Sequence, residues 1–212
     1  EEATPTPPGA WPERSGERVE RRERAQTALL LGFPGAHRQD PDRHALHLLA
    51  NALTGLGGRF FDELRERRSL AYAVSAHPRV RWLSGEFVAY IATSPERESE
   101  ARAGLIDGFR RLAEEGLDMG ELERARRYTL GSWRIRGRTN DAQLSRLIDA
   151  LLFGNGLADM RDFEATIEAI DAEAVRSALA RRFDPARIVT GVVRGRARRA
   201  PEPALPRTST AH

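Results

Sequence analysis

The 212-residue sequence contains no cysteine and no lysine, and it has only two methionines. The absence of cysteine excludes disulfides, thiol catalysis and cysteine-based zinc sites in this stretch of chain. The absence of lysine means that all 34 basic residues are arginines. No apolar run approaches the ~20 residues that a membrane-spanning helix needs, so the sequence predicts a soluble chain without a membrane span. Its compartment, cytoplasmic or periplasmic, is left open.

The charge pattern predicts a solvated surface and no nucleic-acid partner. The 34 arginines are balanced by 31 acidic residues, which leaves a net charge of +3. Acids and arginines alternate in the stretches ERVERRERA, ELRERR and ELERARR and do not gather into one basic stripe. Such alternation is typical of helix faces that carry ion pairs. An arginine-rich nucleic-acid-binding domain is therefore the least favoured alternative, because it requires a continuous basic patch.

Composition divides the chain into three parts. Residues 1–24 contain TPTPPG followed by alternating Glu and Arg, so a disordered linker is predicted there. Residues 196–212 have the same character and are predicted to be a disordered tail. Residues 25–195 are long enough to form one domain. The chain begins at Glu1, and we expect it to be a piece of a longer protein.

Within 25–195 the pattern of apolar residues predicts an α+β fold. Ala25–Phe33 is predicted to be a strand, and a helix with Asp40 as its N-cap and Pro41 in first position is expected to end at Gly55. The stretch EFVAYIAT is expected to form an antiparallel hairpin with Leu70–His77. Further helices are predicted after Ser94 and Pro95, after a capping box at Asp118 and Glu121, and over 140–153, 159–170 and 172–183, followed by a strand over 188–193. This order predicts a two-layer fold, a mainly antiparallel sheet with helices on one face.

The histidines and glycines do not predict a metal or nucleotide site. The five histidines are His37, His44, His47, His77 and His212. His44 and His47 lie three positions apart with no Glu between them, and neither H-E-x-x-H nor H-x-x-E-H occurs. The glycines of TGLGGRFF lack the residues of a phosphate-binding loop, so we interpret them as a tight turn. No catalytic residue and no metal ligand is predicted in this chain.

The stretch Gly57–His77, GGRFFDELRERRSLAYAVSAH, carries the strongest functional signal. It predicts a glycine turn, a short helix and a strand, with Arg65 and Tyr72 seven positions apart across the helix-to-strand corner. A guanidinium and a phenol at one corner can bind a carbonyl or carboxylate from two directions. The alternative is structural: Arg65 pairs with Glu63 or Glu66, and Tyr72 fills the inner face of the strand. The residues alone favour this structural alternative.

The same stretch resembles the C-terminal domain of the pitrilysin/insulinase-type zinc peptidases, the inverted H-x-x-E-H or inverzincin enzymes. Bacterial homologues of mitochondrial processing peptidase are the most similar group. DPDRHALHLLANALTG, LDMGELERARRYTLGSW, LLFGNGL and IEAIDAEAVRSALARRFDPARIVTGVVRG resemble further family segments in the same order. One departure is that Gly58-Arg59-Phe60 stands where the family commonly has Ser-Arg-Leu, which we expect to loosen the start of the helix.

The resemblance implies that this chain is the substrate-binding, non-catalytic half of a zinc metalloendopeptidase. Arg65 and Tyr72 would bind the peptide backbone near the scissile bond, and the adjoining strand could pair with an extended peptide. Zinc would be a cofactor of the parent enzyme, bound by an N-terminal catalytic domain in the same protein or in a partner subunit of a homodimer or heterodimer. The alternative is a recognition-only subunit, or a catalytically dead scaffold of the same family.

Overall fold

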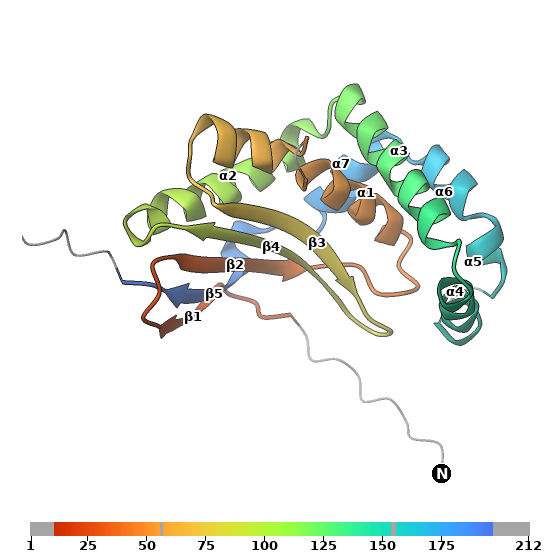
Figure 1. Ribbon diagram of the computed structural model, residues 1–212, viewed down its shortest axis with the longest axis horizontal. Helices are drawn as coiled ribbons and strands as arrows, with labels where there is room; N and C mark the ends of the chain where they lie inside the picture. Colours follow the sequence, from red (N-terminus) through yellow and green to blue (C-terminus); the bar gives the residue numbers. More distant parts are fainter. Residues whose placement is uncertain (1–10, 56, 154–155, 197–212) are drawn as a thin grey trace, which may run out of the picture.

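A computed structural model describes residues 11–55, 57–153 and 156–196 (Figure 1). One five-stranded sheet forms one layer of the molecule, and the helices cover one face of it. This arrangement confirms the predicted two-layer α+β fold. Within the described residues, no helix is both long and apolar enough to cross a membrane.

The sheet has the strand order β1-β5-β2-β4-β3. Its strands are β1 (Gly16–Arg21), β2 (Thr27–Pro34), β3 (Ala73–Val80), β4 (Gly85–Thr93) and β5 (Val189–Arg194). Every neighbouring pair is antiparallel except β1 and β5. β3 and β4 form the predicted hairpin, with Val74 opposite Ile91.

The helices lie between β2 and β3 and between β4 and β5. They are α1 (Arg43–Leu53), the π-helix η1 (Phe61–Arg67), α2 (Glu98–Glu115), α3 (Met119–Arg136), α4 (Asn140–Phe153), α5 (Ala158–Arg161), α6 (Phe163–Ala169) and α7 (Ala172–Ala180), with 3-10 turns at Pro95–Arg97 and Pro185–Arg187. The capping box of α3 forms as predicted: the Glu121 N–H donates to Asp118 Oδ1 over 2.8 Å, and the Asp118 N–H donates to Glu121 Oε2 over 2.9 Å.

The prediction of a disordered linker over residues 1–24 is wrong for at least part of that segment. Residues 16–21 form β1, which pairs in parallel with β5 along its whole length. Trp11 also contacts the fold, because its indole N–H donates to the Arg187 carbonyl over 2.8 Å. All six residues of β1 are exposed, and main-chain pairing at a sheet edge needs no apolar side chains. A prediction based on composition therefore missed it. Residues 197–212, most of the predicted tail, lie outside the described residues.

The predicted N-cap, Asp40, accepts the Asp42 N–H through Oδ1 over 2.9 Å, although the regular helix begins only at Arg43. Asp42, the residue directly before the helix, makes no side-chain capping bond. Both carboxylates also bind the arginines at the end of α7: Arg182 donates to Asp40 over 2.7 Å, and Arg181 donates to Asp42 over 2.8 Å. A local capping bond and ion pairs with a distant segment therefore both hold the start of α1.

The core between the layers is centred on Phe109 of α2. Its ring centroid lies 5.1 Å from that of Phe33 in β2, 5.0 Å from Phe60, 5.9 Å from Phe87 in β4 and 5.5 Å from Phe183. Three of these contacts are edge-to-face, an arrangement that aromatic rings prefer. One buried ring thus joins α2 to the sheet, to the residue preceding η1 and to the segment after α7.

We expect Phe109→Ala to lower the free energy of unfolding by about 3–5 kcal/mol, because the cavity is enclosed by aromatic side chains that cannot all collapse into it. Urea denaturation followed by circular dichroism measures the change. Ile135→Ala is the control, since Ile135 on α3 is 68% exposed and its loss should change stability by less than about 0.5 kcal/mol. A Phe109→Ala variant as stable as this control would contradict the central role of the ring.

Candidate binding corner

Arg65 lies in η1 and Tyr72 lies directly before β3, and buried residues hold the corner between these two elements in place. Leu64 precedes Arg65 and is buried, and Ala71 precedes Tyr72 and is also buried. Leu70 is buried as well, and its N–H donates to the Leu64 carbonyl over 2.7 Å. The buried neighbours turn the side chains of Arg65 and Tyr72 toward the surface.

Main-chain hydrogen bonds fix the turn between the two residues. Ser69 adopts a φ of +49°, a conformation uncommon outside glycine, and its N–H donates to the Arg65 carbonyl over 3.0 Å. The Ser69 carbonyl accepts a hydrogen bond from Arg97 over 2.7 Å, and the Tyr72 N–H donates to the Ala92 carbonyl over 2.8 Å. The corner is therefore held to β4 and to the turn that precedes α2.

Glycines on α2 allow this corner to lie close to the helix. A Cβ at Gly104 would lie 2.9 Å from Leu64 Cδ2, and one at Gly108 would lie 2.7 Å from Phe60 Cε1. Both distances are shorter than an ordinary carbon–carbon contact. Glycine at these two positions therefore lets Leu64 of η1 and Phe60, which precedes η1, pack directly on the α2 backbone.

The side chains of Arg65 and Tyr72 are both accessible. The Arg65 guanidinium lies 4.8 Å from the ring centroid of Phe61, and its ion pair with Glu66 is long, at 3.9 Å. Glu63, the other expected partner, binds Arg111 over 2.6 Å. Tyr72 is 58% exposed and does not fill the inner face of the strand. The structural alternative thus fails for Tyr72 and leaves only a weak pair for Arg65.

The start of the helix is not loosened, contrary to the expectation drawn from Gly58-Arg59-Phe60. Phe60 is fully buried against Phe109. Arg59 donates through Nε to Glu121 Oε1 over 2.7 Å, and a second guanidinium nitrogen binds Glu121 Oε2. Burial by itself would lower the pKa of Arg59, but the hydrogen bond and charge of Glu121 outweigh it, so the pKa of Arg59 is raised. Glu121 therefore caps α3 and holds the residues before η1 in one arrangement.

The free edge of β3 is partly closed to an added strand. The Thr54 hydroxyl accepts from the Ala76 N–H over 2.9 Å and donates to the Ala76 carbonyl over 3.0 Å. Pro78, two residues later, has no N–H to donate. The expectation that an extended peptide pairs along this strand therefore fails at Ala76–Pro78. The exposed side chains of the corner are the better contact points.

Among the described residues, His44 and His47 have no acidic side chains placed with them to hold a metal ion. In the part of the chain that the structure describes, no group of three or more His, Asp or Glu side chains is placed to hold a metal ion. His44 packs edge-on against Phe163, with centroids 5.5 Å apart. Burial, together with the nearby charge of Arg43, lowers the pKa of His44 to about 4. A zinc ion does not fit this environment, because its neighbours are largely arginines.

The low pKa of His44 makes folding sensitive to acid. The unfolded histidine takes up a proton near pH 6.5, whereas the folded one resists protonation until about pH 4, so stability falls as the pH drops through this window. Between pH 7 and pH 5, we expect the free energy of unfolding to fall by about 1–2 kcal/mol less in His44→Gln than in the wild type. Urea titrations at both pH values measure the difference. His77→Gln is the control, because His77 is exposed on β3. If His77→Gln reduced the pH dependence of the free energy of unfolding as much as His44→Gln, the assignment to His44 would be contradicted.

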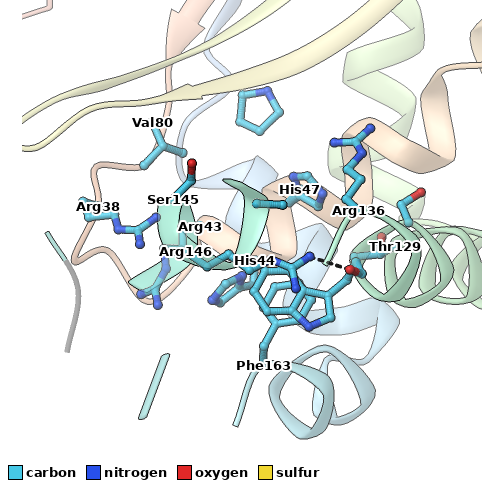
Figure 2. A pocket seen from close by; sticks show the side chains of 14 residues that line it. Arg38, Arg43, His44, His47, Val80, Thr129, Arg136, Ser145, Arg146 and Phe163 are labelled. Atoms are coloured by element: carbon cyan, nitrogen blue, oxygen red, sulfur yellow. Dashed lines mark hydrogen bonds between the residues drawn. The ribbon is translucent and has the colours of Figure 1, made fainter. Parts of the chain in front are cut away.

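Sequence reasoning missed a second site at the other end of β3. A cavity of about 410 Å³ lies between α1, α3, α4 and the end of β3, and its wall includes four arginines: Arg38, Arg43, Arg136 and Arg146 (Figure 2). These residues are spread over more than 100 positions and form no local motif. The only local signal was the pair His44 and His47, which was considered solely as a metal site.

Comparisons with known proteins agree with this fold. A family model described as the peptidase M16 inactive domain matches residues 2–129. An uncharacterised zinc protease of Streptomyces coelicolor is 31% identical over 157 residues, which cover 74% of this chain and 34% of that protein. An uncharacterised zinc protease of Mycobacterium bovis is 31% identical over 171 residues, which cover 78% of this chain and 39% of that protein. This chain therefore belongs to the peptidase M16 family and corresponds to its inactive domain.

Solved structures show the same fold. A peptidase M16 inactive domain from Pseudomonas fluorescens superimposes with a TM-score of 0.79 at 26% identity, covering 91% of this chain and 46% of that one. A protease from Helicobacter pylori superimposes with a TM-score of 0.75 at 17% identity, covering 92% of this chain and 48% of that one. The chain spans a little over a third of the length of the two curated relatives above and about half of these solved chains.

Proposed function

We propose that this chain is the substrate-binding, non-catalytic half of a zinc metalloendopeptidase. The observation that carries the proposal is the exposed pair Arg65 and Tyr72 on a rigid corner, in a chain that belongs to the inactive-domain family. The zinc ion that the relatives' names imply would belong to a catalytic domain outside this chain. No step of hydrolysis is assigned to residues described here.

The chemistry of the pair suits a peptide backbone. Arg65 keeps its positive charge at any physiological pH and offers several N–H donors, and the Tyr72 phenol offers an O–H donor. Two donors directed at a carbonyl oxygen hold a substrate in position and stabilise negative charge as it develops on that oxygen. Because backbone carbonyls are common to all peptides, such binding favours extended peptides with little sequence preference.

In the complete enzyme, we expect Arg65→Ala to lower kcat/KM for peptide hydrolysis by about 10- to 100-fold, since a charge-assisted hydrogen bond contributes about 1.5–3 kcal/mol. Tyr72→Phe should have a smaller effect of about 3- to 10-fold. Steady-state kinetics measures both, and zinc content should stay at the wild-type level in each variant.

Two matched variants control for non-specific effects. Arg67→Ala removes a more exposed arginine from the same helix, one that pairs with Asp62 over 2.7 Å. Tyr128→Phe removes the hydroxyl of an exposed tyrosine on α3. If kcat/KM fell no further in the Arg65 and Tyr72 variants than in these controls, the proposed role of Arg65 and Tyr72 in peptide binding would be refuted. Loss of peptide affinity in a complex that hydrolyses nothing would identify a recognition-only subunit.

We further propose that α4 contacts the catalytic domain. This helix stands at the end of the helical layer, away from β1 and β5 (Figure 1). It exposes a stripe of large aliphatic side chains, namely Leu144, Leu147, Ile148, Leu151 and Leu152. Apolar surface of this extent marks an interaction site in soluble proteins. The curated relatives are about three times as long as the matched region, which leaves room for a partner domain to cover the stripe.

Leu151→Glu should weaken association with the catalytic half by at least about tenfold, because the carboxylate would be buried without a partner. It should leave the stability of the isolated chain within about 0.5 kcal/mol of wild type, since Leu151 is 62% exposed. Analytical ultracentrifugation or titration of the two halves measures the affinity. Met119→Glu, at an exposed position on α3, is the control. An unchanged affinity for Leu151→Glu would show that α4 lies outside the interface.

A further inference from the structure

The arginine cavity at the end of β3 carries a charge that the fold leaves unbalanced. Its four arginines come from four places: Arg38 from the loop before α1, Arg43 from α1, Arg136 from α3 and Arg146 from α4. Among the described residues, no Asp or Glu lines this cavity, although a smaller adjoining cavity that shares Arg38, Arg43 and Arg146 is also lined by Asp149 and Asp159. Figure 2 shows Arg38 and Arg136 on opposite sides, with His44 and His47 between them.

Only one of the four arginines is neutralised by an ion pair among the described residues. Arg43 donates to Asp159 over 3.0 Å, and Asp159 is not among the residues that line this cavity. Arg146 lies over the Trp133 ring, 3.4 Å from its centroid, and donates to the Trp133 carbonyl. Neither of these two contacts neutralises the positive charge of Arg146.

Arg38 contributes a buried donor that no described residue satisfies. Its Nε is buried and has no hydrogen-bond partner within the described part of the chain. A buried donor without a partner is costly, and in native proteins it calls for an explanation such as a bound ligand. Arg38 forms no ion pair with a described carboxylate, so its guanidinium is available to an anion.

The other groups in the wall fit the same chemistry. Burial and repulsion from Arg43 lower the pKa of His44 to about 4, so His44 is neutral at pH 7 and adds no charge. Ser132 and Ser145 also line the cavity and can donate hydroxyl hydrogen bonds. A cation would be repelled here, whereas an oxyanion would find forked donors and hydroxyls.

We propose that this cavity binds a small ligand that carries two or more oxyanion charges, either as phosphate or as carboxylate groups. Guanidinium forks match both groups in geometry and charge. A volume of about 410 Å³ holds a small organic anion, and it lies within the size range of ligand pockets. The site is separate from the Arg65 and Tyr72 corner, because it lies beyond the far end of β3. The proposal does not depend on peptidase activity.

Isothermal titration of the 212-residue chain tests the proposal. The probes are pyrophosphate and citrate, and sodium chloride of equal ionic strength serves as the blank. We expect saturable 1:1 binding of at least one probe. Tighter binding of pyrophosphate would identify phosphate as the preferred group of the ligand, and tighter binding of citrate would identify carboxylate. Absence of saturable binding by both would overturn the proposal.

Substitutions locate the binding. Arg38→Gln should weaken it by about fivefold to tenfold, and Arg38→Gln combined with Arg136→Gln should abolish it. Arg127→Gln is the matched control, since this exposed arginine on α3 forms only a 3.8 Å pair with Glu123. Equal weakening by Arg127→Gln would show diffuse attraction to an arginine-rich surface, which refutes the site.

A second measurement covers the case in which Arg38→Gln does not fold. Arg38→Lys keeps the charge but loses the fork, so it should bind more weakly than wild type and more tightly than the Gln variant. In the wild type, NMR signals of His44 should shift as pyrophosphate or citrate is added, while those of the exposed His77 should not. A His44 signal that does not respond to a probe that binds would place that binding elsewhere.

Discussion

The packing of Phe109 between the two layers is the constraint on which the rest of the structure depends. Its ring contacts the neighbouring strands β2 and β4 through Phe33 and Phe87, and it contacts Phe60, the residue directly before η1. Gly108 and Gly104 then allow that region to pack directly on α2. The position of the Arg65 and Tyr72 corner is thus fixed by core packing, and only secondarily by its own hydrogen bonds.

The two proposed binding sites lie at opposite ends of the edge strand β3. The Arg65 and Tyr72 corner precedes its first residue, and the arginine cavity lies around its last residues, Pro78 and Val80. The middle of the strand is held by Thr54 and does not offer a continuous edge. The strand therefore separates a pair of exposed donors from a partly enclosed cationic cavity. The physical difference is solvent access, which favours an extended backbone at one end and a small anion at the other.

Local signals predicted most of the fold. The β3–β4 hairpin and the capping box at Asp118 and Glu121 were correct because their determinants lie within a few residues of each other. β1 was missed because an exposed edge strand is held by main-chain bonds that composition does not report. The capping bond of Asp40 was predicted because it is local, whereas its ion pair with Arg182 was not, because Arg182 lies far away in sequence. The spacing of Arg65 and Tyr72 was visible in the sequence, whereas their exposure depended on the burial of Leu64 and Ala71.

The sequence by itself determined the fold class, the family resemblance and the identity of the two candidate peptide-binding residues. These rest on short-range patterns and on motif spacing, which a linear chain displays directly. Only the tertiary structure decided that Tyr72 faces solvent, that Glu121 holds Arg59, and that four distant arginines share one cavity. Each of these depends on burial or on charges brought together from separate elements. Because burial and electrostatic balance are properties of the packed molecule, no local pattern could have revealed them.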